Sequence, residues 1–410
     1  MLLQKNLYKK KALDHNMLKE KIAKLAKDLH PAVVKNRRHL HANPELSFEE
    51  YQTAEFVKQC LNDLEVSWTP MANTGVVGMI EGRKPSDNLI ALRADMDALP
   101  ITEANEIEYA STNSGVMHAC GHDAHTSSLL GTAAILQSMR DDFGGRIKLI
   151  FQPGEEKLPG GASMMIKEGV LEKNKPSAVI AQHVSPMIQA GKIGIRKGKF
   201  MASMDEILVT VHGRGGHGAQ PHLNVDPVMI AAQILTALQQ VVSRMANPTL
   251  PTVLSFGKVI ANGAINVIPD TVYMEGTFRT LQEDWRDDAH ARMKNIAQSI
   301  AESMGGSCEF IINRGYPFLI NEEKLTDKVQ HYAQEYLGNE NVLDQDIWMA
   351  SEDFARFSQT VDSCFYLIGV RNESRGFTSS LHTPTFNLDE SALETGMGLM
   401  AYIALKQLGN

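Results

Sequence analysis

The sequence predicts an α/β fold made of two domains, one inserted in the other. Three observations carry this prediction: a length of 410 residues, an alternation of helical and extended patterns, and a change in that alternation after Gly198. A chain of this length exceeds what one compact core of ordinary size holds, so two domains are expected. With 43% hydrophobic and 21% charged residues, the composition is that of a globular protein and carries no signature of disorder.

Helices and strands alternate through the first half of the chain. Apolar residues recur at helical spacing in some segments, and short apolar runs bounded by Gly, Pro, Asn or Asp separate them. The expected helices are 17–29, 48–64, 124–139 and 161–168, and the expected strands are 75–80, 89–94, 146–151 and 178–183. This order predicts a mixed, largely parallel sheet with helices on both faces.

After Gly198 the order becomes strand, helix, strand, strand, helix, strand. The segments are 206–212, 227–245, 252–260, 271–278, 287–304 and 307–313. They predict a ferredoxin-like α+β unit, in which two helices cover one face of a four-stranded antiparallel sheet. The α/β pattern then resumes with helix 322–336, strand 364–370 and helix 389–408. We therefore expect a discontinuous catalytic domain, 1–200 and 314–410, and an inserted satellite domain, 201–313.

Net charge and cysteine content restrict the expected binding partners and the expected cellular compartment. A net charge of -8 supplies no basic face for nucleic acid. The N-terminus lacks the apolar run of a secretory signal, and we expect no membrane-spanning segment of about 20 apolar residues. The four cysteines, Cys60, Cys120, Cys308 and Cys364, are too scattered for a disulfide framework. A cytoplasmic location is expected.

Residues 117–125 (MHACGHDAH) carry the strongest chemical signal, because they place a thiol, imidazoles and a carboxylate close together. Thiolate and imidazole suit zinc and its first-row neighbours, and Gly121 lets the backbone bend between Cys120 and His122. A lone Cys or His would favour a buried structural role, but the combination favours metal. No second motif completes a local four-ligand set, so the remaining ligands must come from elsewhere. That pattern favours an open, catalytic site.

Two acidic clusters follow expected strands. Glu155 and Glu156 project from the turn after strand 146–151, where one carboxylate could bind metal while the other accepts a proton from metal-bound water. A pair of solvated, idle side chains is the alternative. Asp97, after strand 89–94, could orient a ligating histidine through its far nitrogen, or could be an ordinary polar residue at a strand end. His183 and His382 are similarly ambiguous on their own.

The inserted domain contributes three candidate polar residues. The glycines of residues 213–218 (GRGGHG) surround His217, but the segment lacks the Lys-Ser/Thr of a phosphate-binding loop, so we expect a bend that presents His217. Asn266 adds an amide. Arg279 could pair with a substrate carboxylate, although a structural salt bridge is the commoner fate of an Arg on a strand.

Taken in order, these segments resemble the M20 family of metallopeptidases and amidohydrolases, in its aminoacylase, hippurate hydrolase and auxin-conjugate (IAA-amino acid) hydrolase branch. The likeness runs from about residue 37 to residue 408. It is carried by 39–47 (HLHANPELS), 117–125, 153–156 (PGEE), 215–217 (GGH), 266–270 (NVIPD), 351–354 (SEDF) and 381–384 (LHTP).

The resemblance implies a ligand set and a general base. The metal ligands would be Cys120, His122, Glu156, His183 and His382. They would hold one or two divalent ions, Zn, Mn, Co or Ni, and where two ions bind, Cys120 would bridge them. Glu155 would be the general base.

The resemblance also implies a homodimer, or a higher homo-oligomer, formed through the satellite domain. His217 would reach the partner's active site as an oxyanion or substrate ligand, and Asn266 and Arg279 would hold the polar end of the substrate. One departure concerns Asp95, where many relatives in other branches have a metal-binding histidine. His122 would supply the imidazole instead.

The expected function is metal-dependent hydrolysis of the amide bond of N-acyl-L-amino acids, by Glu-assisted attack of metal-bound water. The first alternative keeps the same machinery in a metallo-dipeptidase or carboxypeptidase that acts on short peptides. The second is a non-catalytic, metal-dependent binding protein. Glu155 argues against this second reading, because a binding module needs no base beside a metal-held water.

Overall fold

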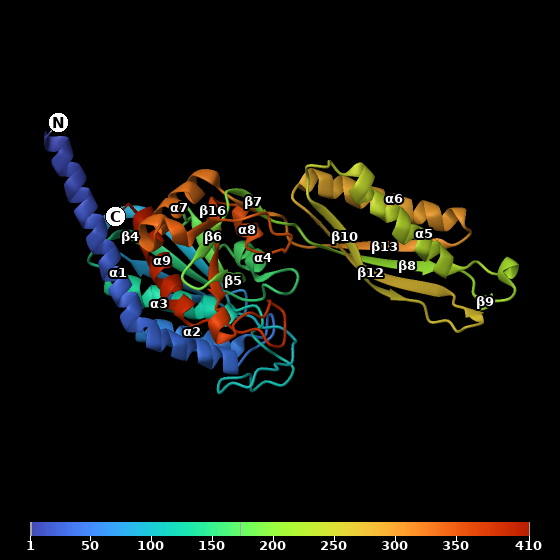
Figure 1. Cartoon of the computed structure of the whole chain (residues 1–410), viewed down its shortest axis with the longest axis horizontal. Coiled ribbons are helices and arrows are strands. Elements are labelled where there is room, and N and C mark those ends of the chain that lie inside the picture. Colours follow the sequence, from blue (N-terminus) through green and yellow to red (C-terminus); the bar gives the residue numbers. More distant parts are fainter. Residues whose placement is uncertain (1, 173, 410) are drawn as a thin grey trace. The chain divides into compact units, whose positions relative to one another are not determined.

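The computed structural model describes residues 2–172 and 174–409. The chain divides into two compact units, drawn in Figure 1. Unit 1 comprises Met1–Gly198, Ile320–Asp346 and Arg356–Asn410, and unit 2 comprises Lys199–Leu319 and Ile347–Ala355. The segment Ile347–Ala355, which the sequence assigns to the catalytic domain, lies in unit 2 because the backbone N–H of Ala202 donates to Trp348 and Ala350.

Unit 1 is built on an eight-stranded mixed sheet. Its strand order is β1 (Ser67–Met71), β2 (Gly75–Glu81), β4 (Gly144–Gln152), β3 (Lys84–Asp95), β5 (Val179–Gln189), β16 (Ser363–Arg371), β6 (Ile193–Ile195) and β15 (Val342–Asp344). The central strands β4, β3, β5 and β16 pair in parallel, whereas β1, β2 and β6 add antiparallel pairs. Nearly every residue of β4 and β16 is buried, as expected where both faces of a sheet are covered.

The helices of unit 1 are α1 (Leu2–Ala42), α2 (Tyr51–Asp63), α3 (His122–Ser138), α4 (Gly161–Lys167), α7 (Glu323–Leu337) and α9 (Ser391–Gln407). Helices α1, α3 and α9 pack against one another. The buried residues Ile22, Ala26, Val33 and Leu40 line one face of α1. This face continues past Pro31, so α1 extends well beyond the helix 17–29 that the sequence predicts. Tertiary packing here outweighs the local cost of the proline.

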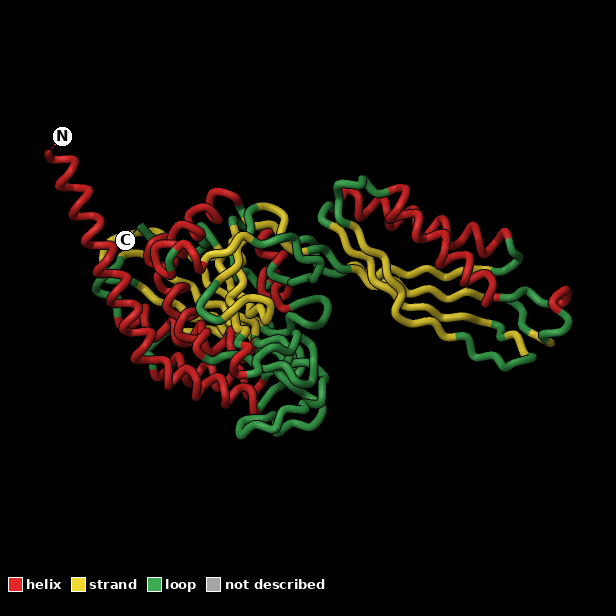
Figure 2. The backbone as a smooth tube through the Cα atoms, viewed as in Figure 1, coloured by secondary structure: helices red, strands yellow, loops and turns green. Residues whose placement is uncertain are grey.

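Unit 2 contains a four-stranded antiparallel sheet and two long helices. Figure 2 shows these helices on one face of the sheet. The strands are β10 (Thr252–Ile260), β12 (Thr271–Thr280), β8 (Asp205–His212) and β13 (Ser307–Arg314), in this order, and the helices are α5 (Pro227–Gln240) and α6 (Glu283–Ser303). Burial alternates along β8, with Ile207, Val209 and Val211 in the core. The predicted fold class is confirmed in both units.

The remaining elements are short. Strands β7 (Gly198–Met201) and β14 (Leu319–Asn321) lie where the chain passes between the units, and β9 (Gly216–His217) pairs with β11 (Val267–Ile268) in unit 2. The short helical turns are η1 (Pro221–Leu223), the π-helical η2 (Val241–Met245), η3 (Asn339–Asn341), α8 (Ala355–Ser358) and η4 (Glu373–Arg375).

By length and composition alone, one helical stretch among the described residues, Pro227–Met245, is long and apolar enough to cross a membrane. The sequence predicts no such segment. In unit 2, Ile230, Ile234 and Leu238 of this stretch are buried in the core. Core helices of folded domains meet the same criteria of length and composition.

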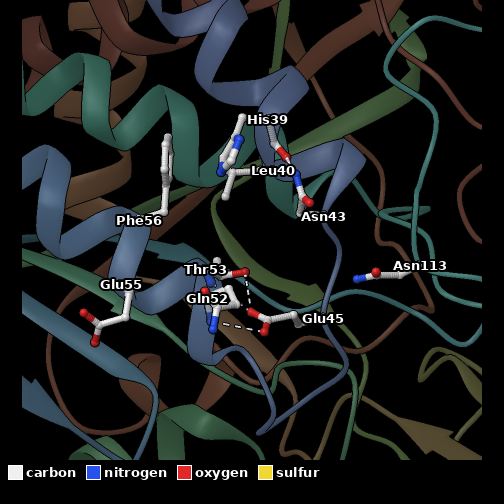
Figure 3. Close-up of a pocket in the computed structure, with 9 residues that line it drawn as sticks. All are labelled: His39, Leu40, Asn43, Glu45, Gln52, Thr53, Glu55, Phe56 and Asn113. Carbon is white, nitrogen blue, oxygen red and sulfur yellow. Dashed lines mark hydrogen bonds between the residues drawn. The ribbon is translucent and has the colours of Figure 1, made fainter.

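Helix α2 begins beside a surface pocket of about 410 Å³. Figure 3 shows Glu45 reaching from the turn after α1 to the first residues of α2. Its carboxylate accepts hydrogen bonds from the backbone N–H groups of Gln52 (3.1 Å) and Thr53 (2.8 Å) and from the Thr53 hydroxyl (2.9 Å). Glu45 thereby satisfies two backbone donors that a helix start leaves without intrahelical partners.

Candidate metal centre

The loop that leads into α3 carries two predicted ligands on either side of a required glycine. Gly121 has a φ of 85° and precedes the first residue of α3, His122. A Cβ on Gly121 would lie 2.4 Å from Cγ2 of Val184 in β5. Glycine therefore permits both the left-handed conformation and the close packing of this loop against β5.

The structure brings the five predicted ligands together in unit 1. The Cys120 Sγ atom lies 3.5 Å from Nε2 of His183 and 3.3 Å from Nε2 of His382. The same His382 nitrogen lies 3.1 Å from Oε1 of Glu156. Cys120, His122 and His183 form one group whose donor atoms all lie within 4.8 Å of one another, and Cys120, Glu156 and His382 form a second. Cys120 belongs to both groups.

The donor atoms fit a divalent cation. Among the described residues, no hydrogen-bond partner is found for the buried His122 Nε2 atom or for Oε1 of Glu156, which lies 3.1 Å from Nε2 of His382. Buried polar atoms are normally hydrogen-bonded, so unpaired donor atoms in this cluster are consistent with metal ligation. A thiolate, three imidazoles and a carboxylate are ligands that zinc and its neighbours accept.

Negative charge accumulates at the centre. Burial, followed by the carboxylates of Glu156 and Glu155, raises the pKa of the Cys120 thiol well above its ordinary value. Burial opposes the charged form of His122, yet Asp95 and Asp97 raise the pKa of this imidazole to about 10. A bound divalent cation would reverse both effects, because it favours the thiolate and the neutral imidazole.

Asp97 orients His122 and anchors the loop that carries the two glutamates. The Nδ1 atom of His122 lies 2.9 Å from the backbone oxygen of Asp97 and 3.2 Å from its Oδ1. The carboxylate of Asp97 also accepts hydrogen bonds from the backbone N–H groups of Glu155 (3.0 Å) and Glu156 (2.9 Å) and from the Ser47 hydroxyl (2.6 Å). Although burial opposes ionisation, the His122 hydrogen bond and charge lower the pKa of Asp97.

A second carboxylate, Glu50, holds the same loop and was not predicted. Its Oε1 accepts a hydrogen bond from the backbone N–H of Gly154 at 2.7 Å, and its Oε2 accepts one from the Thr74 hydroxyl at 2.6 Å. The ring of Phe48 occupies the space that a Cβ on Gly154 would need. Burial and the charge of Asp97 raise the pKa of Glu50 to about 7. Glu50 lies just beyond the motif 39–47, and proximity to that motif was the only signal for it.

Glu155 lies beside the predicted ligands. It is buried, and it forms a further group of possible metal-binding atoms with His122 and Glu156. Asp95, His122 and His125 form another such group, which the sequence did not predict. In that group Asp95 lies 2.6 Å from His125 and 2.7 Å from the guanidinium of Arg93.

The three predicted residues of unit 2 fall into two places. His217 of β9 and Asn266 are exposed at the small two-stranded sheet of β9 and β11, where the Gly218 N–H donates to the Asn266 carbonyl at 2.8 Å. Arg279 lies near the opposite end of β12, because Thr271 at the start of that strand pairs with His212 at the end of β8. At the rise of an extended strand this separation is roughly 25 Å.

Arg279 is half-buried, and its Nη1 donates to the backbone oxygen of Met349 at 2.9 Å. Burial lowers its pKa. No carboxylate in the described parts of the chain pairs with it. The structural salt bridge considered as an alternative is therefore not found in residues 2–172 and 174–409.

Comparisons with known proteins agree with this architecture. The sequence model of peptidase family M20/M25/M40 matches residues 91–406. The thermostable carboxypeptidase 2 of Saccharolobus solfataricus is 38% identical over 95% of this chain and 98% of its own length. The N-acyl-L-amino acid amidohydrolase of Geobacillus stearothermophilus is 44% identical over 75% of this chain and 83% of its own length.

Among solved structures, a Bacillus subtilis protein described as a dinuclear metal-binding peptidase of the M20 family is similar to this chain. Its TM-score is 0.79 at 33% identity, over 93% of this chain and 99% of that one. The resemblance drawn from the sequence motifs is confirmed. The chain belongs to peptidase family M20/M25/M40, as a metal-dependent hydrolase that acts on amide bonds.

Proposed function

We propose that the protein hydrolyses the amide bond of N-acyl-L-amino acids and that Glu155 is its general base. The observation that carries the proposal is the position of Glu155, whose carboxylate shares a group of possible metal-binding atoms with His122 and Glu156. A base beside metal ligands is what hydrolysis needs and what a pure binding site does not.

Each group in the proposed site has its own role in the reaction. A divalent ion, when bound, polarises the substrate carbonyl and makes a nearby water more acidic. Glu155 accepts the proton of the attacking water and then passes it to the leaving amine. His217 of the partner subunit donates a hydrogen bond to the oxyanion that develops on the carbonyl oxygen.

The proposed ligands are Cys120, His122, Glu156, His183 and His382, and they would hold two divalent ions. Two observations support two ions: Cys120 belongs to two groups of possible metal-binding atoms, and the B. subtilis relative is described as dinuclear. The donor set suits Zn, Mn, Co or Ni, among which cellular availability would decide.

Arg279 is the proposed partner of the substrate carboxylate, and Asn266 the proposed amide contact. The guanidinium of Arg279 is half-buried with a backbone carbonyl as its hydrogen-bond acceptor. Such a group gains a charge-assisted hydrogen bond when a carboxylate arrives. The name of the G. stearothermophilus relative supports a substrate that carries one, because an N-acyl amino acid has a free carboxylate.

A homodimer through unit 2 is part of the proposal. A small substrate cannot contact both His217 and Arg279 of one chain, because they lie roughly 25 Å apart along unit 2. In a dimer, one chain can supply His217 and the other Arg279 to the same substrate. Unit 2 exposes Val228 and Met229 of α5 and Val259 and Ile260 of the edge strand β10, which are 37–52% exposed. Exposed apolar residues on a helix and an edge strand favour an interface.

A carboxypeptidase or dipeptidase acting on short peptides is the second candidate. The name of the S. solfataricus relative favours it, and the same base and ligands would serve. Peptides also present a free carboxylate to Arg279, so the acyl side of the substrate distinguishes the two candidates.

A substrate panel tests the proposal. The metal-stripped enzyme is reconstituted with Zn, Mn, Co or Ni and given acetyl, benzoyl and indole-acetyl amino acids beside dipeptides. We expect faster cleavage of the acyl amino acids with at least one metal. Preference for dipeptides would favour the second candidate, and absence of any hydrolysis would contradict both.

A further inference from the structure

Two buried residues, Asp95 and His125, form a hydrogen-bonded chain behind the proposed ligand His183. Asp95 is the last residue of β3 and is fully buried, and its Oδ2 accepts a hydrogen bond from Nη1 of Arg93 at 2.7 Å. Its Oδ1 lies 2.6 Å from Nδ1 of His125, in the first turn of α3. The adjacent guanidinium favours the ionised carboxylate, which can only accept, so Nδ1 of His125 is the donor.

The other ring nitrogen of His125 is also occupied. Its Nε2 accepts a hydrogen bond from the backbone N–H of Val184 at 2.8 Å. A backbone N–H only donates, so this Nε2 carries no proton. His125 is therefore a neutral imidazole with its proton on Nδ1, and neither nitrogen has a lone pair left for an ion.

Val184 connects this chain to His183. The Nδ1 atom of His183 lies 2.8 Å from the backbone oxygen of Val184, which only accepts, so Nδ1 carries the proton. The lone pair of His183 is then on Nε2, the nitrogen that faces Cys120 Sγ at 3.5 Å. Val184 is thus held at its N–H by His125 and at its carbonyl by His183, and its side chain packs against Gly121.

We propose that Asp95 and His125 are positioning residues, which hold the Val184 backbone so that His183 keeps the tautomer and direction of an Nε2 metal ligand. The inference rests on the proposed function, because it takes His183 as a ligand. Partners of this kind, one shell behind a metal, fix ring orientation and ligand basicity.

The competing possibility is that Asp95, His122 and His125 themselves bind an ion, since their donor atoms lie within 4.8 Å of one another. The two hydrogen bonds of His125 argue against it, because an ion would have to displace Asp95 or the Val184 N–H. The two possibilities predict different metal stoichiometries.

A matched pair of substitutions separates the two hydrogen bonds of His125. In His125→Gln the side-chain oxygen can reach the Nε2 position and still accept from the Val184 N–H. In His125→Asn the amide can replace only Nδ1 as donor to Asp95, and the Val184 N–H loses its acceptor. Each variant is metal-stripped, checked for its apo melting temperature, and titrated with zinc against a competing chelator. Bound metal is then counted at saturation, and the cobalt-substituted form is examined by absorption.

We expect zinc affinity to fall about 10- to 100-fold in His125→Asn and to fall less in His125→Gln, which keeps an acceptor for the Val184 N–H but loses the hydrogen bond to Asp95. Metal content at saturation should equal that of the parent in both, and the cobalt spectrum should change in His125→Asn. Equal affinity in the two variants would overturn the proposal. Loss of one ion per chain at saturation would show instead that His125 is a ligand.

A measurement on the unsubstituted, zinc-loaded enzyme covers the case in which a variant does not fold. Nitrogen-15 histidine NMR should show His125 with its proton on Nδ1 and a strongly downfield Nδ1–H signal. An Nε2–H tautomer or an imidazolium at His125 would contradict the proposal. His183→Ala separates this failure from failure of the ligand set, because unchanged metal binding there would reject His183 as a ligand whatever His125 does.

Discussion

At the scale of the residue, Asp97 links a proposed ligand to the loop that carries the proposed base. Its carboxylate accepts from the Ser47 hydroxyl and from the N–H groups of Glu155 and Glu156, and it faces Nδ1 of His122. From its spacing after a strand, the sequence left two interpretations of Asp97 open: an orienting partner of a ligating histidine, or an ordinary polar residue at a strand end. Its bonds to the glutamate loop join residues about 60 positions apart, and no local pattern reports such pairs.

Replacing Asp97 by Asn should weaken metal binding. One carboxylate oxygen becomes an NH₂ group that points at hydrogen-bond donors, so His122 and the glutamate loop lose a common acceptor. We expect zinc affinity to fall about 10- to 100-fold, measured by chelator competition. Asp63→Asn, at an exposed position in α2, is the control. Parent-like affinity in Asp97→Asn would mean that the loop is held by other contacts.

Glu50 should make stability depend on pH. Its pKa is raised from 4.5 to about 7 in the folded protein, so the folded state holds this proton more tightly than the unfolded chain does. The stability it contributes is complete below pH 4.5 and is lost as the pH rises through 7.

In the Glu50→Gln variant the side chain at position 50 cannot ionise, so the variant does not lose this stability as the pH rises. We compare the metal-free proteins. The unfolding free energy of the variant minus that of the parent should rise by up to about 3 kcal/mol between pH 4.5 and 8. Urea titrations at four pH values measure the difference. A difference that stays constant with pH would contradict the raised pKa.

At the scale of the element, periodicity identified most helices and strands, because the long segments bury one consistent face. Helices α5 and α6 and strands β8, β12 and β13 appear close to their predicted bounds. Helix α1 is longer than predicted, since Pro31 is a helix-breaking signal and the packing that overrides it lies outside the local sequence. The three-residue strands β6 and β15 are too short to show any period.

A substitution of Glu45 tests whether this residue caps helix α2. Glu45→Ala removes the acceptors for the N–H groups of Gln52 and Thr53 at the start of α2. Loss of a helix cap typically lowers the unfolding free energy by about 1–2 kcal/mol. Glu55→Ala is the matched control, because Glu55 lines the same pocket and forms an exposed ion pair with the nearby Lys58. This variant should change the unfolding free energy by under about 0.5 kcal/mol. Equal effects in urea unfolding would reject the capping role.

At the scale of the whole molecule, the motifs predicted which side chains gather at the candidate metal centre. They could not show that the candidate residues of unit 2 lie in two separate places. The register of β12 with β8 puts His217 and Arg279 at opposite ends of unit 2. That register depends on pairing between distant segments, which the order of motifs does not contain.

Subunit complementation tests whether two chains share a site. In the proposed dimer, the Glu155→Gln and His217→Ala variants should each be inactive on their own. After subunit exchange, a mixed dimer has one site with both residues intact, so about a quarter of parent activity should return at full exchange. Native mass spectrometry confirms the exchange. Mixed dimers without recovered activity would contradict sharing.

The most direct test of the central claim, that Glu155 is the base of a metal-dependent amidohydrolase, is a single substitution. Glu155→Gln keeps the size of the side chain and its backbone N–H bond to Asp97. We expect parent metal content by elemental analysis, with kcat on the best N-acyl amino acid reduced by about 100- to 10,000-fold. Near-parent turnover with metal bound would contradict the claim.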